Sequence, residues 1–373
     1  MAKQHRKIRL MKILDWYILK RLLVTFFFAI LLITVIAVVI DSSEKADDFV
    51  KSGLSTGQII TDYYFGFVPH IVALIFPLIV FIAIIFFTSK LAGRSELIAI
   101  LASGVTFNRM LRPFIMGGAI LALILWLANM YIIPKAQGIR SSFQERYIDR
   151  NSTYNIGGGN YLSYYLRVDS VTFVGFRSYD TTSKSASNFF MHRIKDNKVV
   201  YNLRAERVSW DTAKRSWVLD NALERKVGGL DEEAQLIPKK TVKLNFVPSE
   251  LRKDEYLKDK LTSPELTQYI RREELRGAEG LNTLKVERYR RDATPVAVLI
   301  LSVIGAVVAS RKVRGGSGMH LAFGIVTAAT FILMDRFSTV FSTKGNFPPL
   351  LAAWLPNIIF AGIAYWLYKK APK

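Results

Sequence analysis

Long apolar runs separated by short polar gaps dominate both ends of the chain. The hydrocarbon core of a bilayer requires about 20 apolar residues in a helix. Six runs meet this length: Leu22–Ile40, Phe65–Thr88, Phe114–Ile133, Ala293–Ser310, Leu321–Phe341 and Leu350–Tyr368. The pattern therefore predicts a membrane α-helical bundle of six transmembrane helices, with an N-terminal half over 1–134 and a C-terminal half over 293–373.

The segment between the two halves has a different periodicity. Apolar and polar side chains alternate in SVTFVGFRSY (170–179) and TVKLNFV (241–247), and RAERVSWDTAKRSWVLDNA (204–222) predicts two strands around a polar turn. Period-two alternation is typical of half-buried antiparallel strands. From Ser263 the apolar spacing becomes helical. We therefore predict an inserted all-β domain, a sandwich or jelly roll, over 135–262, followed by a helical connector over 263–292.

Basic and acidic residues are concentrated in different gaps between the apolar runs. The formal net charge of +21 is therefore explained by membrane topology. The N-terminus, the second and fourth gaps and the C-terminus are basic, whereas the first gap is acidic. The first gap holds Asp41, Glu44, Asp47, Asp48 and Asp62; the second holds Lys90, Arg94, Arg109 and Arg112; the fourth holds Arg311, Lys312 and Arg314. Because basic loops stay in the cytoplasm, both termini are predicted to be cytoplasmic and 135–292 to face outward. Charge sorted in this way argues against a nucleic-acid partner.

The sequence lacks the common motifs of catalysis and cofactor binding. There is no G-x-x-x-x-G-K-[ST] or G-x-S-x-G motif, and His5, His70, His192 and His320 are scattered. We therefore expect no catalytic residue, no metal site and no cofactor bound by this chain. The absence of Cys means that the outward domain has no disulfide, which is compatible with a bacterial periplasm.

Five short segments, in order along nearly the whole chain, resemble the LptF/LptG (YjgP/YjgQ) permease family. They are LDWYILKRLL (14–23), RSELIAILASG (94–104), AERVSWDTAKRSWVLDN (205–221), LTSPEL (261–266) and AAWLPN (352–357). The Ser-Glu-Leu and Ala-Ser-Gly sequences of the second segment are closer to LptG than to LptF. The resemblance implies that the outward domain is a periplasmic β-jelly roll and that the chain lies in the bacterial inner membrane as a multi-pass protein.

The resemblance also implies a function and a set of partners. It implies the permease subunit of an ATP-driven transporter, which extracts lipopolysaccharide from the outer leaflet of the inner membrane. The cargo then passes through the periplasmic jelly roll toward the outer membrane. The implied partners are a cytoplasmic LptB-like ATPase dimer that carries ATP and Mg, an LptF-like second permease, and an LptC/LptA-like periplasmic bridge protein. The alternative is a non-transporting mechanotransmission or binding protein of the membrane, coupled to an ATPase.

The stretch RSELIAILASG predicts a short amphipathic helix in the second gap. Ser95 is expected to cap this helix, and Glu96 lies in its first turn, where a negative charge suits the helix dipole. The resemblance adds that such a helix inserts into a groove of the ATPase, where Glu96 would meet a basic residue. The predicted coupling residues are Arg94, Ser95, Glu96, Leu97, Leu101, Ala102, Ser103 and Gly104.

Arg336, late in the fifth run, is predicted to contact a phosphate of the lipopolysaccharide headgroup. Arginine suits phosphate because its planar fork donates two hydrogen bonds at once. The alternative for Arg336 and the adjacent Asp335 is snorkelling or an ion pair with a neighbouring helix. Lys45 and Lys51, beyond the first run, are further headgroup candidates. The predicted walls of an acyl-chain cavity are Phe26, Ile33, Ile36, Phe323, Ile332 and Phe337.

Overall fold

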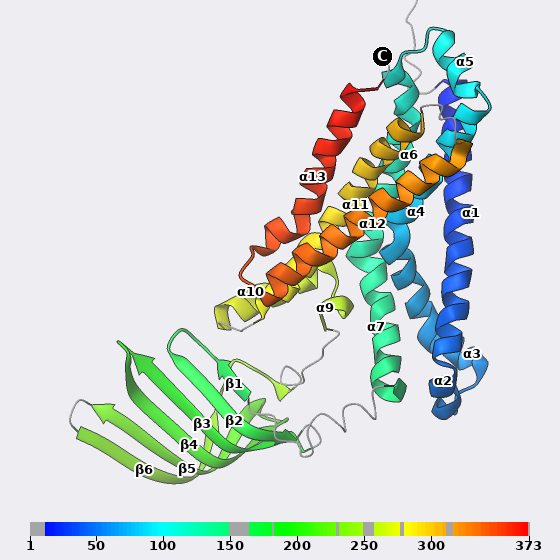
Figure 1. Cartoon of the computed structure of the whole chain (residues 1–373). Coiled ribbons are helices and arrows are strands. Elements are labelled where there is room, and N and C mark those ends of the chain that lie inside the picture. Colours follow the sequence, from blue (N-terminus) through cyan, green and yellow to red (C-terminus); the bar gives the residue numbers. More distant parts are fainter. Residues whose placement is uncertain are drawn as a thin grey trace, which may run out of the picture. The chain divides into compact units, whose positions relative to one another are not determined.

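Long helices and one antiparallel sheet make up the computed structural model of the chain (Figure 1). It describes residues 12–148, 164–180, 183–228, 231–248, 257–276, 280–310 and 316–371. These residues form two compact units. The helical unit contains the residues up to Tyr147, Lys258–Leu266 and those from Asn282 onward, and the sheet unit contains Ile148–Leu257 and Thr267–Leu281. The basic residues before Lys12 and at 311–315 lie outside the described residues.

The described part of the helical unit holds six helices that are long and apolar enough to cross a membrane, as the sequence predicts. Their cores are α1 (Ile13–Glu44), α4 (Phe65–Gly93), α6 (Phe107–Leu127), α11 (Leu281–Ala309), α12 (Gly316–Lys344) and α13 (Pro349–Lys369). The shorter helices of the described residues include α2 (Ala46–Ser52), α3 (Thr56–Ile59), α5 (Glu96–Ala102), α9 (Leu257–Lys260) and α10 (Ser263–Arg276), and most of α10 belongs to the sheet unit.

Two of the long helices are extended by π-helical turns. The turn Ile60–Tyr64 joins α3 to α4. The turns Ala128–Ile132 and Gln144–Ile148 lie on either side of α7 (Ile133–Phe143) and continue the helix that begins with α6. The boundary predicted at residue 135 therefore falls inside a continuous helix. The apolar run ends near residue 133, but the helix continues to Ile148 with many polar residues. The end of the apolar run therefore does not mark the end of the helix.

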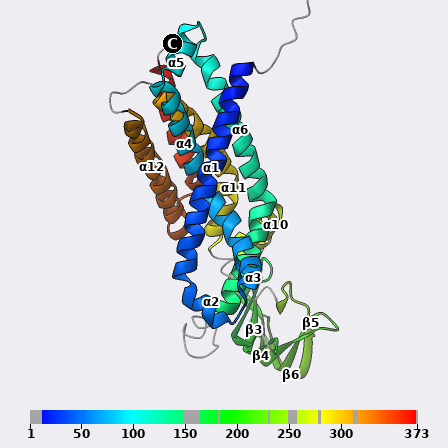
Figure 2. The same cartoon turned by 90° about the vertical axis from the view of Figure 1, so that its right-hand side faces the viewer.

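Both views of the helical unit place α5 and the C-terminus at one end (Figure 1, Figure 2). The start of α1 lies at this same end, whereas α2 and α3 lie at the opposite end. At the α5 end, the buried Asp15 accepts a hydrogen bond from the backbone N–H of Lys12 at 2.9 Å. Asp15 also pairs with Arg109 of α6 at 3.1 Å. The acid in the segment LDWY thus fastens the first turn of α1 to α6.

Prolines within the long helices leave backbone carbonyls without their helical donors. Pro295 frees the carbonyl of Arg291, and Asn129 of the neighbouring helix donates to it at 3.5 Å. Pro356 frees the carbonyl of Ala352, and Ser338 of α12 donates to it at 2.7 Å. Since lipid offers no hydrogen bonds, such donors from neighbouring helices satisfy the freed carbonyls and tie the helices together.

The sheet unit contains six strands in the described residues: β1 (Tyr164–Arg167), β2 (Thr172–Asp180), β3 (Ser185–Lys195), β4 (Lys198–Asp211), β5 (Ser216–Gly228) and β6 (Asp231–Val242). Each strand pairs antiparallel with the next, in chain order. The inserted antiparallel β domain is thus confirmed, and Trp210 pairs with Trp217 across the predicted hairpin. The described strands form a meander, without the crossovers that two Greek keys would give a jelly roll.

The strand expected over 241–247 is wrong in its position. The sixth strand is Asp231–Val242, and the chain leaves the sheet after Val242. This strand was missed because it is polar and contains Pro238. An edge strand tolerates both features, since its outer side needs no ladder partner. The alternation after residue 242 has another cause: Leu244 and Phe246 pack on the core of the sheet as an irregular segment.

Trp217 joins this irregular segment to the sheet, because its Nε1–H donates to the carbonyl of Phe246 at 3.0 Å in a buried position. We expect Trp217→Phe to increase local opening of the segment that contains Leu244 and Phe246. The reason is that the buried carbonyl of Phe246 then lacks a donor, which costs about 1–3 kcal/mol. Hydrogen exchange at Leu244–Val247 measures the effect. Trp210→Phe is the matched control, and equal exchange in both variants would refute the role of the hydrogen bond.

Candidate functional site

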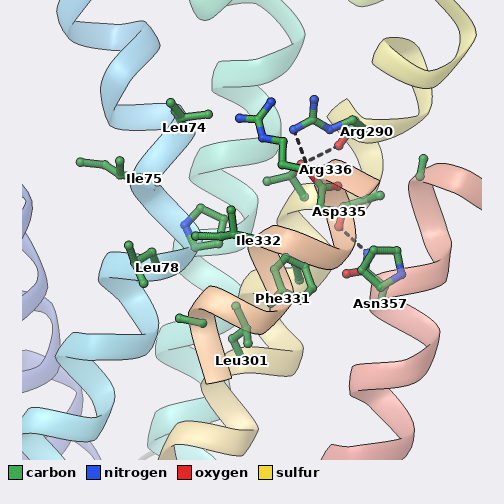
Figure 3. Close-up of a pocket in the computed structure, with 17 residues that line it drawn as sticks. Leu74, Ile75, Leu78, Arg290, Leu301, Phe331, Ile332, Asp335, Arg336 and Asn357 are labelled. Carbon is green, nitrogen blue, oxygen red and sulfur yellow. Dashed lines mark hydrogen bonds and ion pairs between the residues drawn. The ribbon is translucent and has the colours of Figure 1, made fainter. Parts of the chain in front are cut away.

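An apolar cavity of about 240 Å³ lies among α4, α11, α12 and α13 within the helical unit (Figure 3). The cavity exists partly because small side chains line it on three of these helices. They are Ala293, Ala297, Ala328 and Ala353. Leu74, Leu78, Leu301, Phe331 and Ile332 supply most of the remaining apolar wall. Asn357, which is buried, donates to the carbonyl of Ala293 at 2.8 Å and so contributes a satisfied polar group. The cavity is therefore suited to hydrocarbon.

A polar cavity of about 330 Å³ adjoins the apolar one. Leu74, Arg290, Thr294 and Arg336 line both cavities. The polar wall further includes His70, Asn129, Gln137, Lys258, Asp259, Glu287 and Arg291. Burial raises the pKa of Asp259, and the nearby Glu287 adds to this rise. Together the two cavities offer an apolar compartment and a charged compartment in one part of a single chain.

Arg290 and Arg336 differ in their partners although they line the same two cavities. Arg290 pairs with Asp335 of α12 at 3.1 Å, an ion pair that Figure 3 marks at the end of the apolar cavity. The Nε of Arg290 is buried and has no hydrogen-bond partner. Arg336 is exposed, and within the described residues it forms no ion pair. Arg336 thus keeps its donors available, as a phosphate contact requires.

Arg291 is a structural residue of the polar cavity. Its buried guanidinium donates to the carbonyls of Leu261 at 2.7 Å and Lys258 at 2.8 Å. It also lies 3.4 Å from Glu287 of its own helix. These bonds hold the segment from α9 to the start of α10 against α11. Since its donors are used within the protein, Arg291 is poorly suited to bind a ligand.

The sequence pattern does not identify Arg290 and Glu287 as site residues. For Asp335 it suggests only snorkelling or an ion pair with a neighbouring helix, and Asp335 forms the second of these with Arg290. Arg290 and Glu287 fall within the stretch that was assigned to a helical connector, whereas α11 is one helix from Leu281 to Ala309. A signal was present in VERYRRD (286–292), where acids and bases recur at helical spacing at the start of a membrane helix. Helical spacing brings Glu287 and Arg290 onto one face.

Of the predicted cavity residues, only Ile332 lines one of these two cavities. Phe26 instead packs in the core against Phe76, with ring centroids 4.9 Å apart. Ile33 and Ile36 on α1 and Phe323 and Phe337 on α12 point away from the core and are exposed. Their role in an acyl-chain cavity stays a prediction.

The two predicted lysines lie in different surroundings. Lys45 pairs with the buried Asp41 at 2.7 Å, and both side chains hydrogen-bond to Tyr63. A headgroup contact by Lys45 would therefore have to break an existing ion pair. Lys51, in the last turn of α2, is exposed. Lys51 is thus the more accessible of the two for an anionic headgroup.

Ser95 occupies the N-cap position of α5, but the expected capping by its side chain is wrong. An N-cap serine needs an extended backbone so that its side chain can accept a helix N–H. Ser95 has a φ of 61°, in the left-handed region, and its side chain accepts no capping hydrogen bond. The left-handed backbone results from the sharp turn between α4 and α5. The N–H of Ser95 donates to the carbonyl of Ala92 in α4, and the carbonyl of Ser95 accepts from the N–H of Ala99 in α5. Gly104, with a φ of 83°, makes the turn at the other end of α5.

The short helix α5 buries one face and leaves the other accessible. Leu97 is only 1% exposed, and Leu101 packs against the core of the helical unit. Ile98 is 48% exposed. Glu96 lies 3.9 Å from Arg94, and both side chains are partly exposed, so this ion pair contributes little. Glu96 and Ile98 thus form an accessible pair of an acidic and an apolar side chain at the α5 end of the helical unit.

Comparisons with known proteins agree with this layout. A family model described as "Lipopolysaccharide export system permease LptF/LptG" matches residues 16–370. Two relatives, from Escherichia coli strain K12 and from Escherichia coli O6:H1 strain CFT073, are both named lipopolysaccharide export system permease protein LptG. Each is 20% identical over 365 residues, which cover 95% of this chain and 97% of the relative. The chain therefore belongs to the LptF/LptG family of lipopolysaccharide export system permeases and is LptG-like.

Proposed function

We propose that this chain is the permease subunit of an ATP-driven exporter that extracts lipopolysaccharide from the outer leaflet of the inner membrane. The observation that carries the proposal is the family match over residues 16–370, together with six helices of membrane-spanning length. An LptF-like second permease completes the membrane part as a heterodimer. An LptB-like ATPase dimer with ATP and Mg hydrolyses the nucleotide, and an LptC/LptA-like bridge protein receives the cargo.

In this proposal, the α5 end of the helical unit faces the cytoplasm. The support is the basic charge near that end, including Lys90, Arg94, Lys369 and Lys370, against the acids of α2 at the other end. The sheet unit then lies in the periplasm and passes the cargo on. The exposed side of α5, with Glu96 and Ile98, docks into the ATPase.

Depletion of this protein in its own bacterium tests the proposal. We expect newly made lipopolysaccharide to accumulate in the inner membrane and to stop reaching the cell surface, because no other part of the exporter can replace a permease subunit. Membrane fractionation with labelled lipopolysaccharide measures this directly. Unchanged delivery to the outer membrane after complete depletion would contradict the proposed function.

Arg336 provides a test at the level of one residue. We expect Arg336→Ala to weaken lipopolysaccharide binding about tenfold, because a charge-assisted hydrogen bond contributes about 1.5–3 kcal/mol and 1.4 kcal/mol corresponds to a factor of ten. Lys51→Ala, which removes an exposed charge, is expected to have a smaller effect. Binding to the purified complex measures both, and equal affinity of wild type and Arg336→Ala would refute the assignment.

A further inference from the structure

The two cavities of the helical unit meet at two guanidinium groups. Arg290 and Arg336 belong to the wall of the apolar cavity and also to the wall of the polar cavity. The residues of the two walls lie on α4, α6 to α7, α9, α11, α12 and α13. An elongated molecule could therefore place an apolar part in one cavity and a charged part in the other.

The charges of the polar cavity favour an anion. Its wall contains two acids, Asp259 and Glu287, and four bases: Lys258, Arg290, Arg291 and Arg336. Arg291 is committed to Glu287 and to backbone carbonyls. Arg290 pairs with Asp335 at 3.1 Å from the side of the apolar cavity and lies 3.9 Å from Glu287 of its own helix. The position of the Asp335 carboxylate thus marks where an anion can meet Arg290.

We propose that the two cavities form a lipid site inside a single protomer, in which Asp335 holds Arg290 until the phosphate of a lipid displaces it. One acyl chain occupies the apolar cavity, and the phosphate binds between Arg290 and Arg336. The site as described is built from residues of this protomer. Its role in export rests on the proposed function, whereas its affinity for a phosphorylated lipid does not.

Phosphate fits this place better than a carboxylate does. Asp335 pairs with Arg290 at 3.1 Å and forms no ion pair with Arg336 within the described residues. A phosphate has more acceptor oxygens and can accept hydrogen bonds from both guanidinium groups at once. Two neighbouring arginines repel each other unless an anion lies between them. Exchange of Asp335 for phosphate leaves Arg290 paired with an anion both before and after binding.

The substitution Asp335→Asn separates this proposal from a purely structural ion pair. If Asp335 competes with phosphate, its neutralisation is expected to raise the affinity for a phosphorylated lipid about tenfold. If the ion pair only supports the fold, affinity would stay equal or fall. Asp47→Asn, on the exposed surface of α2, is the control for a change of net charge.

The experiment uses the full chain, purified in detergent with its associated subunits, and three lipid probes. The probes are lipid A with its phosphates, enzymatically dephosphorylated lipid A, and phosphatidylglycerol. Native mass spectrometry at increasing lipid concentration gives the affinity of each. We expect Asp335→Asn to strengthen binding of one or both phosphorylated probes and to leave binding of dephosphorylated lipid A unchanged.

A second pair of variants tests the apolar cavity without altering an ion pair. Ile332→Trp fills the cavity from its wall and is expected to weaken binding of the phosphorylated lipid about tenfold. Leu333→Trp is the matched control, because the neighbouring Leu333 is 57% exposed and does not line the cavity. This comparison remains informative even if Asp335→Asn fails to fold.

The outcomes show whether the ligand is the cargo or a lipid of the surrounding bilayer. They also separate a failure of this lipid site from a failure of the proposed export function. Stronger binding of lipid A alone in Asp335→Asn identifies the cargo as the ligand, whereas stronger binding of phosphatidylglycerol identifies a lipid of the surrounding bilayer; both support the site. No gain for either phosphorylated probe, or equal effects of Ile332→Trp and Leu333→Trp, would overturn it. Intact ATPase association in these preparations, together with normal lipopolysaccharide delivery in cells that carry the same variants, would leave the proposed function standing in that case.

Discussion

Replacement of Glu96 by lysine is expected to release the ATPase from the permease while the chain remains in the membrane. Glu96 is accessible and has only a weak partner, Arg94, at 3.9 Å. In the proposed complex it meets a basic residue of the ATPase, so the substitution places like charges in contact. Loss of a buried charge pair at an interface costs about 2–5 kcal/mol, which corresponds to more than a tenfold loss of affinity.

Co-purification of the ATPase with the tagged chain measures this loss, and membrane fractionation confirms insertion. Glu96→Ala is expected to show a smaller loss, since it removes the attraction without adding repulsion. Asp47→Lys is the matched control, because Asp47 is an exposed acid of α2, at the end of the helical unit opposite α5. Full recovery of the ATPase with both Glu96 variants would reduce Glu96 to a residue of the first helical turn.

Replacement of Arg291 by alanine is expected to destabilise the helical unit by about 3–6 kcal/mol, because it removes two charge-assisted hydrogen bonds to backbone carbonyls, each of which contributes about 1.5–3 kcal/mol. The guanidinium is only 7% exposed and binds Glu287 together with the carbonyls of Leu261 and Lys258. Its loss would free the segment that leads from α9 into α10. Thermal unfolding in detergent and proteolysis of the segment 257–263 measure the two effects.

Arg288→Ala is the control for Arg291→Ala. Arg288 lies on the same helix and pairs with Asp292 at 2.6 Å, but both side chains are partly exposed, so its loss is expected to cost less than about 1 kcal/mol. If both substitutions lower stability equally, the network around Arg291 does not anchor the segment. If Arg336→Ala is as destabilising as Arg291→Ala, Arg336 is a structural residue as well.

The sequence predicted the six helices correctly because lipid imposes a length and a composition that are visible in any apolar run. The hairpin of β4 and β5 was equally visible, since Trp210 and Trp217 lie on either side of a polar turn. The position of the last strand, Asp231–Val242, was not visible in the sequence pattern. The edge strand β6 is polar, and the apolar residues that follow it cover the sheet as an irregular segment. Period-two alternation does not distinguish these two cases.

The candidate site was predictable only in part, for a related physical reason. Arg336 stood out because a charge within an apolar run is costly. Its neighbours Arg290 and Asp335 depend on how α11 and α12 pack together, and a single sequence does not record that packing. Ser95 illustrates the same limit, because its left-handed backbone is set by the turn between two helices rather than by its residue type. Local patterns thus identify candidate residues but not their partners.

Native mass spectrometry of the affinity-tagged chain, purified in mild detergent from its own host, tests the central claim most directly. The proposed function predicts a complex that contains this chain, a different second permease, two copies of an ATPase and bound lipopolysaccharide. Crosslinking before purification verifies that the preparation is intact. A chain that is intact by this criterion but carries neither ATPase nor lipopolysaccharide would contradict the assignment to an ATP-driven lipopolysaccharide exporter.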